Sequence, residues 1–261
     1  MIQTNRPTPR VLERPILGAL CASILAFAMP TRADTAGDVA RRIVTAHAKG
    51  AVTLQIVLKA AAGDSGDQAE REIDGVVLDA SGLIVTANTN VDPGAVYAAM
   101  SGNEGAYATK VVSVKILMAG GEQIPARVVL RDKDRNLAFL RPLQKPKTAF
   151  TPVSFVKKST ARIGDAIYVL SRLGKTGGRQ ASITFERVYS VIQKPRLMYV
   201  IIPNMYTSLG NAVFNESGQP LGLLSARIGL KTGDSPLPVV VPVSDVMEIA
   251  RQAPPANKAK N

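Results

Sequence analysis

The stretch "YTSLGNAVFNESGQPLGLL" (206–224) combines a turn that contains glycine and asparagine with an apolar run typical of a buried strand. Some hydrolases carry their nucleophile on a tight turn that borders a strand. Ser208 is therefore a candidate nucleophile, and the rest of the chain has to show whether a base and an orienting residue accompany it.

Composition bounds the classes of protein that the chain can belong to. The chain has 261 residues, of which 46% are hydrophobic, so it can build one large β domain or two small ones. Its formal charge of +12 predicts attraction to anionic surfaces, although a soluble exported domain with a basic face is the plainer interpretation. Tryptophan is absent, and the few aromatic residues do not alternate with Lys and Arg. We therefore expect no nucleic acid partner.

The N-terminus has the pattern of a targeting segment. Arg6, Arg10 and Arg14 precede the apolar run "PILGALCASILAFAM" (15–29), which is too short to span a bilayer comfortably. Residues 1–33 are predicted to be a bacterial-type signal peptide or an uncleaved anchor. The protein is accordingly expected to be exported and to be periplasmic or associated with the cell envelope.

Metal and thiol chemistry are not expected. The single cysteine, Cys21, lies inside the apolar run, so the mature chain would contain neither a disulfide nor a thiolate. The single histidine, His47, lies in a predicted helix and has no neighbours at metal-ligand spacing. We predict no cofactor and no metal site.

The rest of the pattern predicts an all-β domain between two helices. Residues 34–50 have an acidic start, an amphipathic middle and a final glycine, which indicate a short helix. Residues 243–252 indicate a closing helix capped by Ser244 or Asp245, and residues 253–261 a disordered tail. Residues 60–72 and 97–110 are predicted to be exposed loops. Short runs rich in Val, Ile and Leu lie between the helices, at 51–58, 74–87, 111–132, 136–143, 164–171, 180–193, 197–202, 220–228 and 237–243.

Four segments in fixed order connect these strands to a known family. They are "LDASGLIVTANTNVD" (78–92), "DKDRNLAFL" (132–140), "GDAIYVLSRLG" (164–174) and "NMYTSLGNAVFNESGQPLGL" (204–223). Their order and spacing resemble those of the Deg-type (HtrA) branch of the trypsin-like serine proteases. The resemblance implies two packed six-stranded β-barrels with a cleft between them over 51–252, the first barrel at 51–145 and the second at 150–243.

The same resemblance assigns the three catalytic positions. The family histidine falls on Thr89, the family aspartate on Asn136 and the family serine on Leu209. None of these side chains can act as base, orienting carboxylate or nucleophile in the family mechanism. The resemblance therefore implies a pseudoprotease that is not an enzyme.

Other readings of the same residues stay open. A one-residue slip would offer Ser208 as nucleophile and Asp134 as orienting residue, but it supplies no base other than the distant His47. A residual serine-type peptidase would then need a non-standard base such as lysine, and none lies in the 200–215 turn. The segment "GKTGGR" (174–179) lacks the spacing of a phosphate-binding loop and is predicted to be a basic, flexible loop near the cleft.

The expected function is binding or assembly. One expected partner is a protein or extended peptide that lies in the cleft between the barrels as an added strand. The alternative is a structural subunit that contacts an anionic envelope surface through its basic face.

Overall fold

The computed structural model describes residues 1, 35–60, 68–101, 108–118, 120–156, 159–203, 208–229 and 235–256. Its helices are α1 (Thr35–His47), the 3-10 turn η1 (Ala48–Gly50), α2 (Asn88–Val91), α3 (Gly94–Ser101), the 3-10 turn η2 (Lys175–Gly177) and α4 (Val243–Ala250). Its first six strands are β1 (Ala51–Ala60), β2 (Gln68–Val77), β3 (Ile84–Ala87), β4 (Thr109–Leu117), β5 (Gln123–Asp132) and β6 (Leu137–Pro142). The later strands are β7 (Ala166–Arg172), β8 (Ala181–Arg187), β9 (Ser190–Ile192), β10 (Met198–Val200), β11 (Ala212–Asn215), β12 (Pro220–Arg227) and β13 (Leu237–Pro242).

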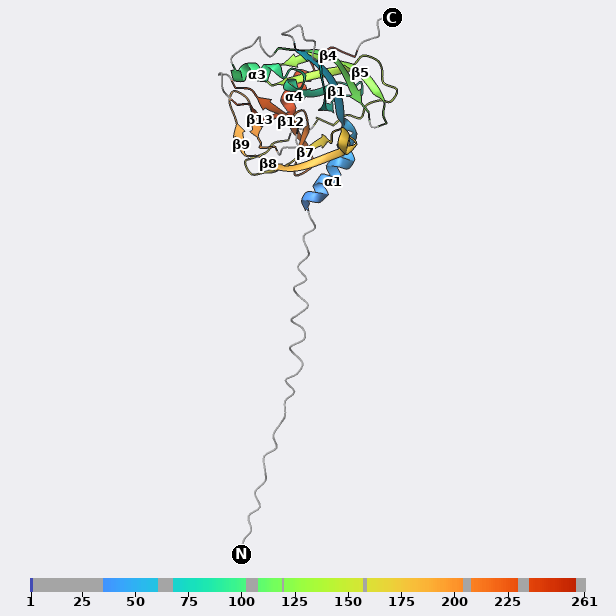
Figure 1. The fold of residues 1–261 in the computed structure, drawn as a ribbon. Coiled ribbons are helices and arrows are strands. Elements are labelled where there is room, and N and C mark those ends of the chain that lie inside the picture. Colours follow the sequence, from blue (N-terminus) through green and yellow to red (C-terminus); the bar gives the residue numbers. More distant parts are fainter. Residues whose placement is uncertain are drawn as a thin grey trace. The chain divides into compact units, whose positions relative to one another are not determined.

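The first six strands close into an antiparallel barrel in the order β1-β2-β3-β6-β5-β4. Figure 1 labels β1, β4 and β5 of this barrel. Alternation of buried and exposed residues directs one face of each strand inward. β4 and β5 show the alternation most clearly, because Val114, Ile116, Ile124 and Ala126 are buried between exposed neighbours. These side chains share one interior cluster with Leu54, Ile56, Ile84 and Leu140.

The second sheet has the same strand order as the first barrel when β8 and β9 are counted as one strand. Its strands run β8-β7-β11-β12-β13-β10-β9, so β8 and β9 lie at its two ends. Only Val188 and Tyr189 separate β8 from β9 in the chain. The Val188 N–H donates to Asp165, directly before β7, and the Tyr189 N–H donates to Val200 of β10. The segment 181–192 therefore acts as one bent strand that joins both ends of the sheet. Together the two halves of the chain form the expected double barrel.

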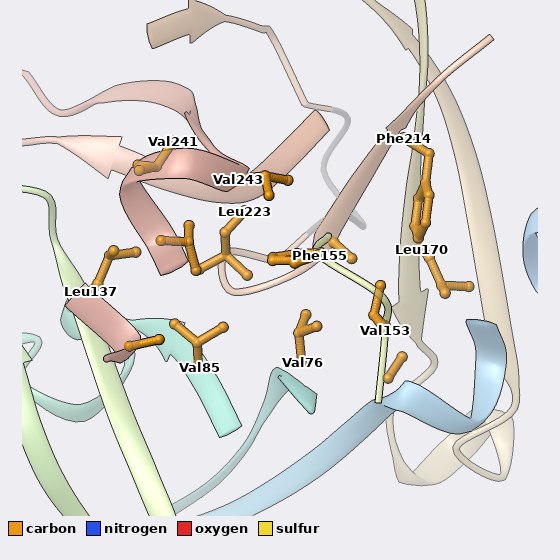
Figure 2. Packing of buried hydrophobic residues seen from close by; sticks show 14 of the residues in the cluster. Val76, Val85, Leu137, Val153, Phe155, Leu170, Phe214, Leu223, Val241 and Val243 are labelled. Carbon is orange, nitrogen blue, oxygen red and sulfur yellow. The ribbon is translucent and has the colours of Figure 1, made fainter. Parts of the chain in front are cut away.

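A third cluster joins the two barrels, and it also includes both terminal helices. Figure 2 shows Val76, Val85 and Leu137 of the first barrel facing Leu223 and Val241 of the second. α1 adds Val39 and Ile43, and α4 adds Val246 and Ile249. Burying these apolar surfaces against one another stabilises the pair of barrels as one body.

The helices at the two ends of the domain agree with the sequence in place but not in detail. α1 and η1 cover the predicted helix at 34–50, and α4 lies within the predicted 243–252. The predicted cap of α4 is wrong: Pro242 is the capping residue, and Ser244 and Asp245 lie inside the first turn. Ser244 Oγ donates to the Asp245 carboxylate, and no side chain of the described residues caps the first N–H groups of α4.

Two predicted loops are partly regular. β2 begins at Gln68, so the end of the predicted loop at 60–72 is strand. In the predicted loop at 97–110, α3 continues to Ser101 and β4 starts at Thr109. The predicted tail at 253–261 is described up to residue 256, where the Pro254 carbonyl accepts a hydrogen bond from Arg141 Nε at 2.7 Å. Among the described residues, no helix is both long and apolar enough to cross a membrane.

Candidate functional site

The structure brings Thr89 and Asn136 together at one end of the first barrel. Thr89 lies in the short helix α2, directly after β3, and Asn136 lies in the turn before β6. The Thr89 N–H donates to Asn136 Oδ1 at 2.9 Å, and Asn136 Nδ2 lies 3.4 Å from Thr89 Oγ1. The two positions that the resemblance assigned to histidine and aspartate are therefore in direct contact.

Asn136 is buried and held by its backbone as well as by its side chain. Its carbonyl accepts hydrogen bonds from the Asn88 N–H and from Ser225 Oγ, each at 2.9 Å. Ser225 belongs to β12, so this second bond ties the first barrel to the second. Asn136 has φ +53°, a left-handed conformation that asparagine tolerates better than most residues.

The turn that carries Leu209 meets the same site from the second barrel. The Leu209 carbonyl accepts a hydrogen bond from Asn90 Nδ2 at 2.9 Å, one residue beyond Thr89. The Leu209 side chain is half-buried and packs against the interior cluster of the second barrel. The three positions assigned by the resemblance thus surround one place between the barrels.

Gly210 allows the turn to approach the first barrel closely. Its φ is +95°, and its N–H donates to the Leu224 carbonyl at 2.8 Å. A Cβ at this position would lie 2.4 Å from Thr86 Oγ1 and 2.7 Å from the Asp74 carbonyl oxygen. Only glycine fits both the backbone conformation and the space.

Ser208, the alternative nucleophile, is bonded to a buried carboxylate. Its Oγ donates to Asp74 Oδ2 at 2.7 Å, and Asn211 Nδ2 donates to the Ser208 carbonyl at 2.7 Å. Asp74 is only 6% exposed. Burial raises the pKa of the Asp74 carboxyl above its ordinary value, while hydrogen bonds from Ser208 and Asn211 and the nearby Arg172 oppose that rise.

His47 lies elsewhere, at the end of α1. Its ring stacks on Phe214 of β11 with 4.9 Å between ring centroids. Partial burial lowers the pKa of His47, which favours the neutral ring. Within the described part of the chain, no hydrogen bond connects His47 to Thr89, Asn136 or Ser208, and its environment is that of a packed aromatic ring.

The other candidate groups form ion pairs. Asp134, the alternative orienting residue, pairs with Arg196, and Asp132 pairs with Arg135 at 3.0 Å. The segment 174–179 forms the loop between β7 and β8, and its Arg179 pairs with Glu72 of the first barrel. In the described part of the chain, no group of three or more His, Cys, Asp or Glu side chains could hold a metal ion.

Sequence reasoning missed three residues that shape the site. Asn90 bridges Thr86 Oγ1 and the Leu209 carbonyl, Asp74 receives Ser208, and Ser225 binds the Asn136 carbonyl. One signal was available: Asp74 is a charged residue at the start of the apolar run 74–77. Asn90 and Ser225 gave none, because their roles depend on contacts between distant segments.

The comparisons with known proteins agree with this geometry. The trypsin-like peptidase domain model matches residues 74–223, which is more than half of the chain and includes all three assigned positions. The chain therefore belongs to the trypsin-like peptidase domain family. A search of the curated proteins finds no match.

Proposed function

We propose that this protein is an exported pseudoprotease of the Deg-type branch, catalytically inactive, whose double barrel serves as a binding or assembly module. The observation that carries the proposal is the contact between Thr89 and Asn136 beside Leu209. In a working site of this class, a base, an orienting carboxylate and a nucleophile act as one unit. Here a hydroxyl, an amide and an alkyl group occupy those positions.

A missing base is the most severe of these changes. Neither a threonine hydroxyl nor an amide takes up a proton near neutral pH. The only histidine of the chain is stacked on Phe214. Leu209 in turn offers no atom that could form an acyl intermediate.

Ser208 is the remaining candidate for a serine-type peptidase. Its hydroxyl has a carboxylate partner in Asp74, but a carboxylate is a much weaker base than an imidazole. Ser208 also uses its hydroxyl proton to satisfy a buried group, which is an ordinary structural role. We therefore rank this activity below binding.

We infer that the end of β12 offers a strand edge for an extended partner. β12 pairs with β11 up to Leu223, while Ser225–Arg227 pair only with β13 among the described strands. The side chain of Ser225, at the start of this stretch, lies next to Asn136, because Ser225 Oγ donates to the Asn136 carbonyl. An extended peptide can add to such an edge through main-chain hydrogen bonds.

The test uses β-casein as both substrate and ligand. We expect the purified protein to bind fluorescent casein without cleaving it, and we expect a fluorophosphonate probe to leave it unlabelled. Casein cleavage or probe labelling that disappears in Ser208→Ala would overturn the inactive role. Competition by a short extended peptide at constant salt is the expected sign of binding at the strand edge.

A second candidate, an envelope subunit that binds an anionic surface, rests on one like-charge pair. Lys59 and Lys110 stand directly opposite each other on β1 and β4, and no acidic side chain of the described residues forms a salt bridge with either. Like charges in this arrangement destabilise a sheet unless an anion binds nearby. Binding to phosphatidylglycerol vesicles that disappears in high salt and in Lys59→Glu/Lys110→Glu would favour this role.

A further inference from the structure

We propose that Asp74 is a proton-operated clamp between the barrels: its ionised carboxylate holds the 208–211 turn, and protonation loosens that turn while both barrels stay folded. The clamp is independent of the binding role proposed above.

The clamp connects elements that are distant in the chain. Asp74 lies on β2 of the first barrel, and Ser208 precedes β11 of the second. The Asp74 carboxylate accepts the Ser208 hydroxyl at 2.7 Å, and its backbone carbonyl accepts Thr86 Oγ1 at 2.7 Å. Asn90 then completes the connection by binding both Thr86 Oγ1 and the Leu209 carbonyl, each at 2.9 Å. Two side chains of the first barrel, Asp74 and Asn90, thus bind the turn directly, and Thr86 connects them to each other.

Few charged groups surround this carboxyl, so its own proton can control the contact. β7 contributes Arg172, whose backbone N–H and positive charge both favour the ionised form. Glu72, two residues away on β2, is already paired with Arg179. The facing residues Thr53 of β1, Thr86 of β3 and Ser208 and Asn211 of the turn are uncharged.

Thr53 offers a hydroxyl group that could bind the Asp74 carboxyl in either protonation state. Thr53 stands directly opposite Asp74 in the β1–β2 pairing, so both side chains lie on the same face of the sheet. Thr53 Oγ1 is buried and has no hydrogen-bond partner among the described residues. The Thr53 hydroxyl lies on the same face of the sheet as the Asp74 carboxyl, so it could accept a hydrogen bond from that carboxyl when it is protonated.

The protonation of Asp74 has two effects of opposite sign, one on the stability of the fold and one on the hydrogen bond with Ser208. Burial disfavours the charge, so the pKa of Asp74 is raised, and the associated stability of the fold is present at low pH and lost as pH rises through that pKa. The Ser208 hydrogen bond works in the other direction, because it lowers the same pKa. By reciprocity, ionisation strengthens that bond and protonation weakens it. Acidification thus favours the folded barrels but weakens the hold on the turn.

The experiment measures the carboxyl and the turn separately in the purified protein. Carboxyl-carbon NMR gives the pKa of Asp74, and amide exchange of Gly210, corrected for its intrinsic pH dependence, reports opening of the turn. We expect Ser208→Ala to raise the Asp74 pKa and Ser208→Thr to keep it near the wild-type value. A shift of one pKa unit corresponds to about a tenfold preference of the Ser208 hydroxyl for the ionised over the protonated carboxyl.

Two further outcomes decide the proposal. Gly210 protection should fall as pH decreases through the Asp74 pKa, and Asp74→Asn should abolish that step. Asp79→Asn is the matched control, because that carboxyl is bound by Leu83 N–H and Ser81 within its own turn. Gly210 protection that does not follow the Asp74 titration, or an Asp74 pKa unchanged by Ser208→Ala, would overturn the clamp.

Discussion

The two barrels have the same strand order but contribute to the site in different ways. The first barrel supplies side chains that bind each other, Thr89 and Asn136. The second supplies a turn that is held mainly through its backbone, by the Leu209 carbonyl and the Gly210 N–H. An asparagine side chain holds each half: Asn136 fixes Thr89, and Asn90 fixes Leu209. The comparison teaches that one half of the site depends on side chains in contact and the other on the backbone of a turn, so substitutions should affect the two halves differently.

The largest effect is expected from Gly210→Ala, which tests the backbone of the second half. The new Cβ would be 2.4 Å from Thr86 Oγ1 in a backbone conformation at φ +95°. We expect a loss of about 3 kcal/mol in the free energy of unfolding, measured with urea. Gly178→Ala separates the two causes, because Gly178 has φ +63° but a free surrounding space, and it should cost about 1 kcal/mol. Equal losses in both variants would contradict the close approach.

Asn136→Ala tests the first half and should cost about 2 kcal/mol. It removes the acceptor of the Thr89 N–H and places alanine at φ +53°. Asn136→Gly is the control, since glycine accepts the backbone conformation but not the hydrogen bond. Urea unfolding of Asn136→Gly should recover about 1 kcal/mol of the loss. If Asn136→Gly is no more stable than Asn136→Ala, the whole loss of stability comes from the contacts of the asparagine side chain.

Leu209→Ala tests whether the leucine has become part of the core of the second barrel. We expect a loss of about 1 kcal/mol, below the range of fully buried leucines, because Leu209 is only half-buried. Leu224→Ala in the same cluster is the comparison and should cost about 3 kcal/mol, since Leu224 is fully buried. A gain in stability for Leu209→Ala would show that the leucine is strained in its turn.

A smaller effect is expected for His47, and it concerns how the thermal stability of the fold depends on pH. Burial lowers its pKa, so the neutral ring is favoured in the folded protein. The related stability is present above the unfolded pKa of about 6.5 and is lost as pH falls below it. His47→Phe should keep the stack on Phe214 and remove this part of the pH dependence of Tm between pH 7 and pH 5. An unchanged pH profile would show that the ring does not titrate differently in the two states.

The smallest effect is expected from restoring the three assigned residues together. Thr89→His, Asn136→Asp and Leu209→Ser should give casein hydrolysis no faster than that of the unmodified protein. The resemblance places the glycine of the family's nucleophile turn at Thr207, so we expect the variant to lack the backbone donors that stabilise the oxyanion. Rapid hydrolysis by the triple variant would show that only side chains separate this protein from an active protease.

Most of the fold could be predicted from local patterns. The alternation in β4 and β5 and the turns at Gly82 and Gly121, both with positive φ, needed no knowledge of distant contacts. α3 was missed, although Pro93 before it and the alanines within it favour a helix. The polar residues that follow α3 favour a loop, and for that reason the pattern of 97–110 as a whole predicts an exposed loop.

The candidate site was predictable only in part. The order of motifs placed Thr89, Asn136 and Leu209, and the structure brings them together. The supporting contacts of Asp74 and Asn90 could not be predicted, because they join residues more than 100 positions apart. Their partners depend on how the barrels pack, and local sequence does not encode that packing.

The cluster in Figure 2 makes the two barrels one cooperative folding unit. Val76 and Val85 on one side and Leu223 and Val241 on the other have no separate apolar cover, so either half alone would expose its share to water. α1 and α4 come from opposite ends of the domain and close the same cluster. The shared core is therefore complete only when α1, both barrels and α4 are all present.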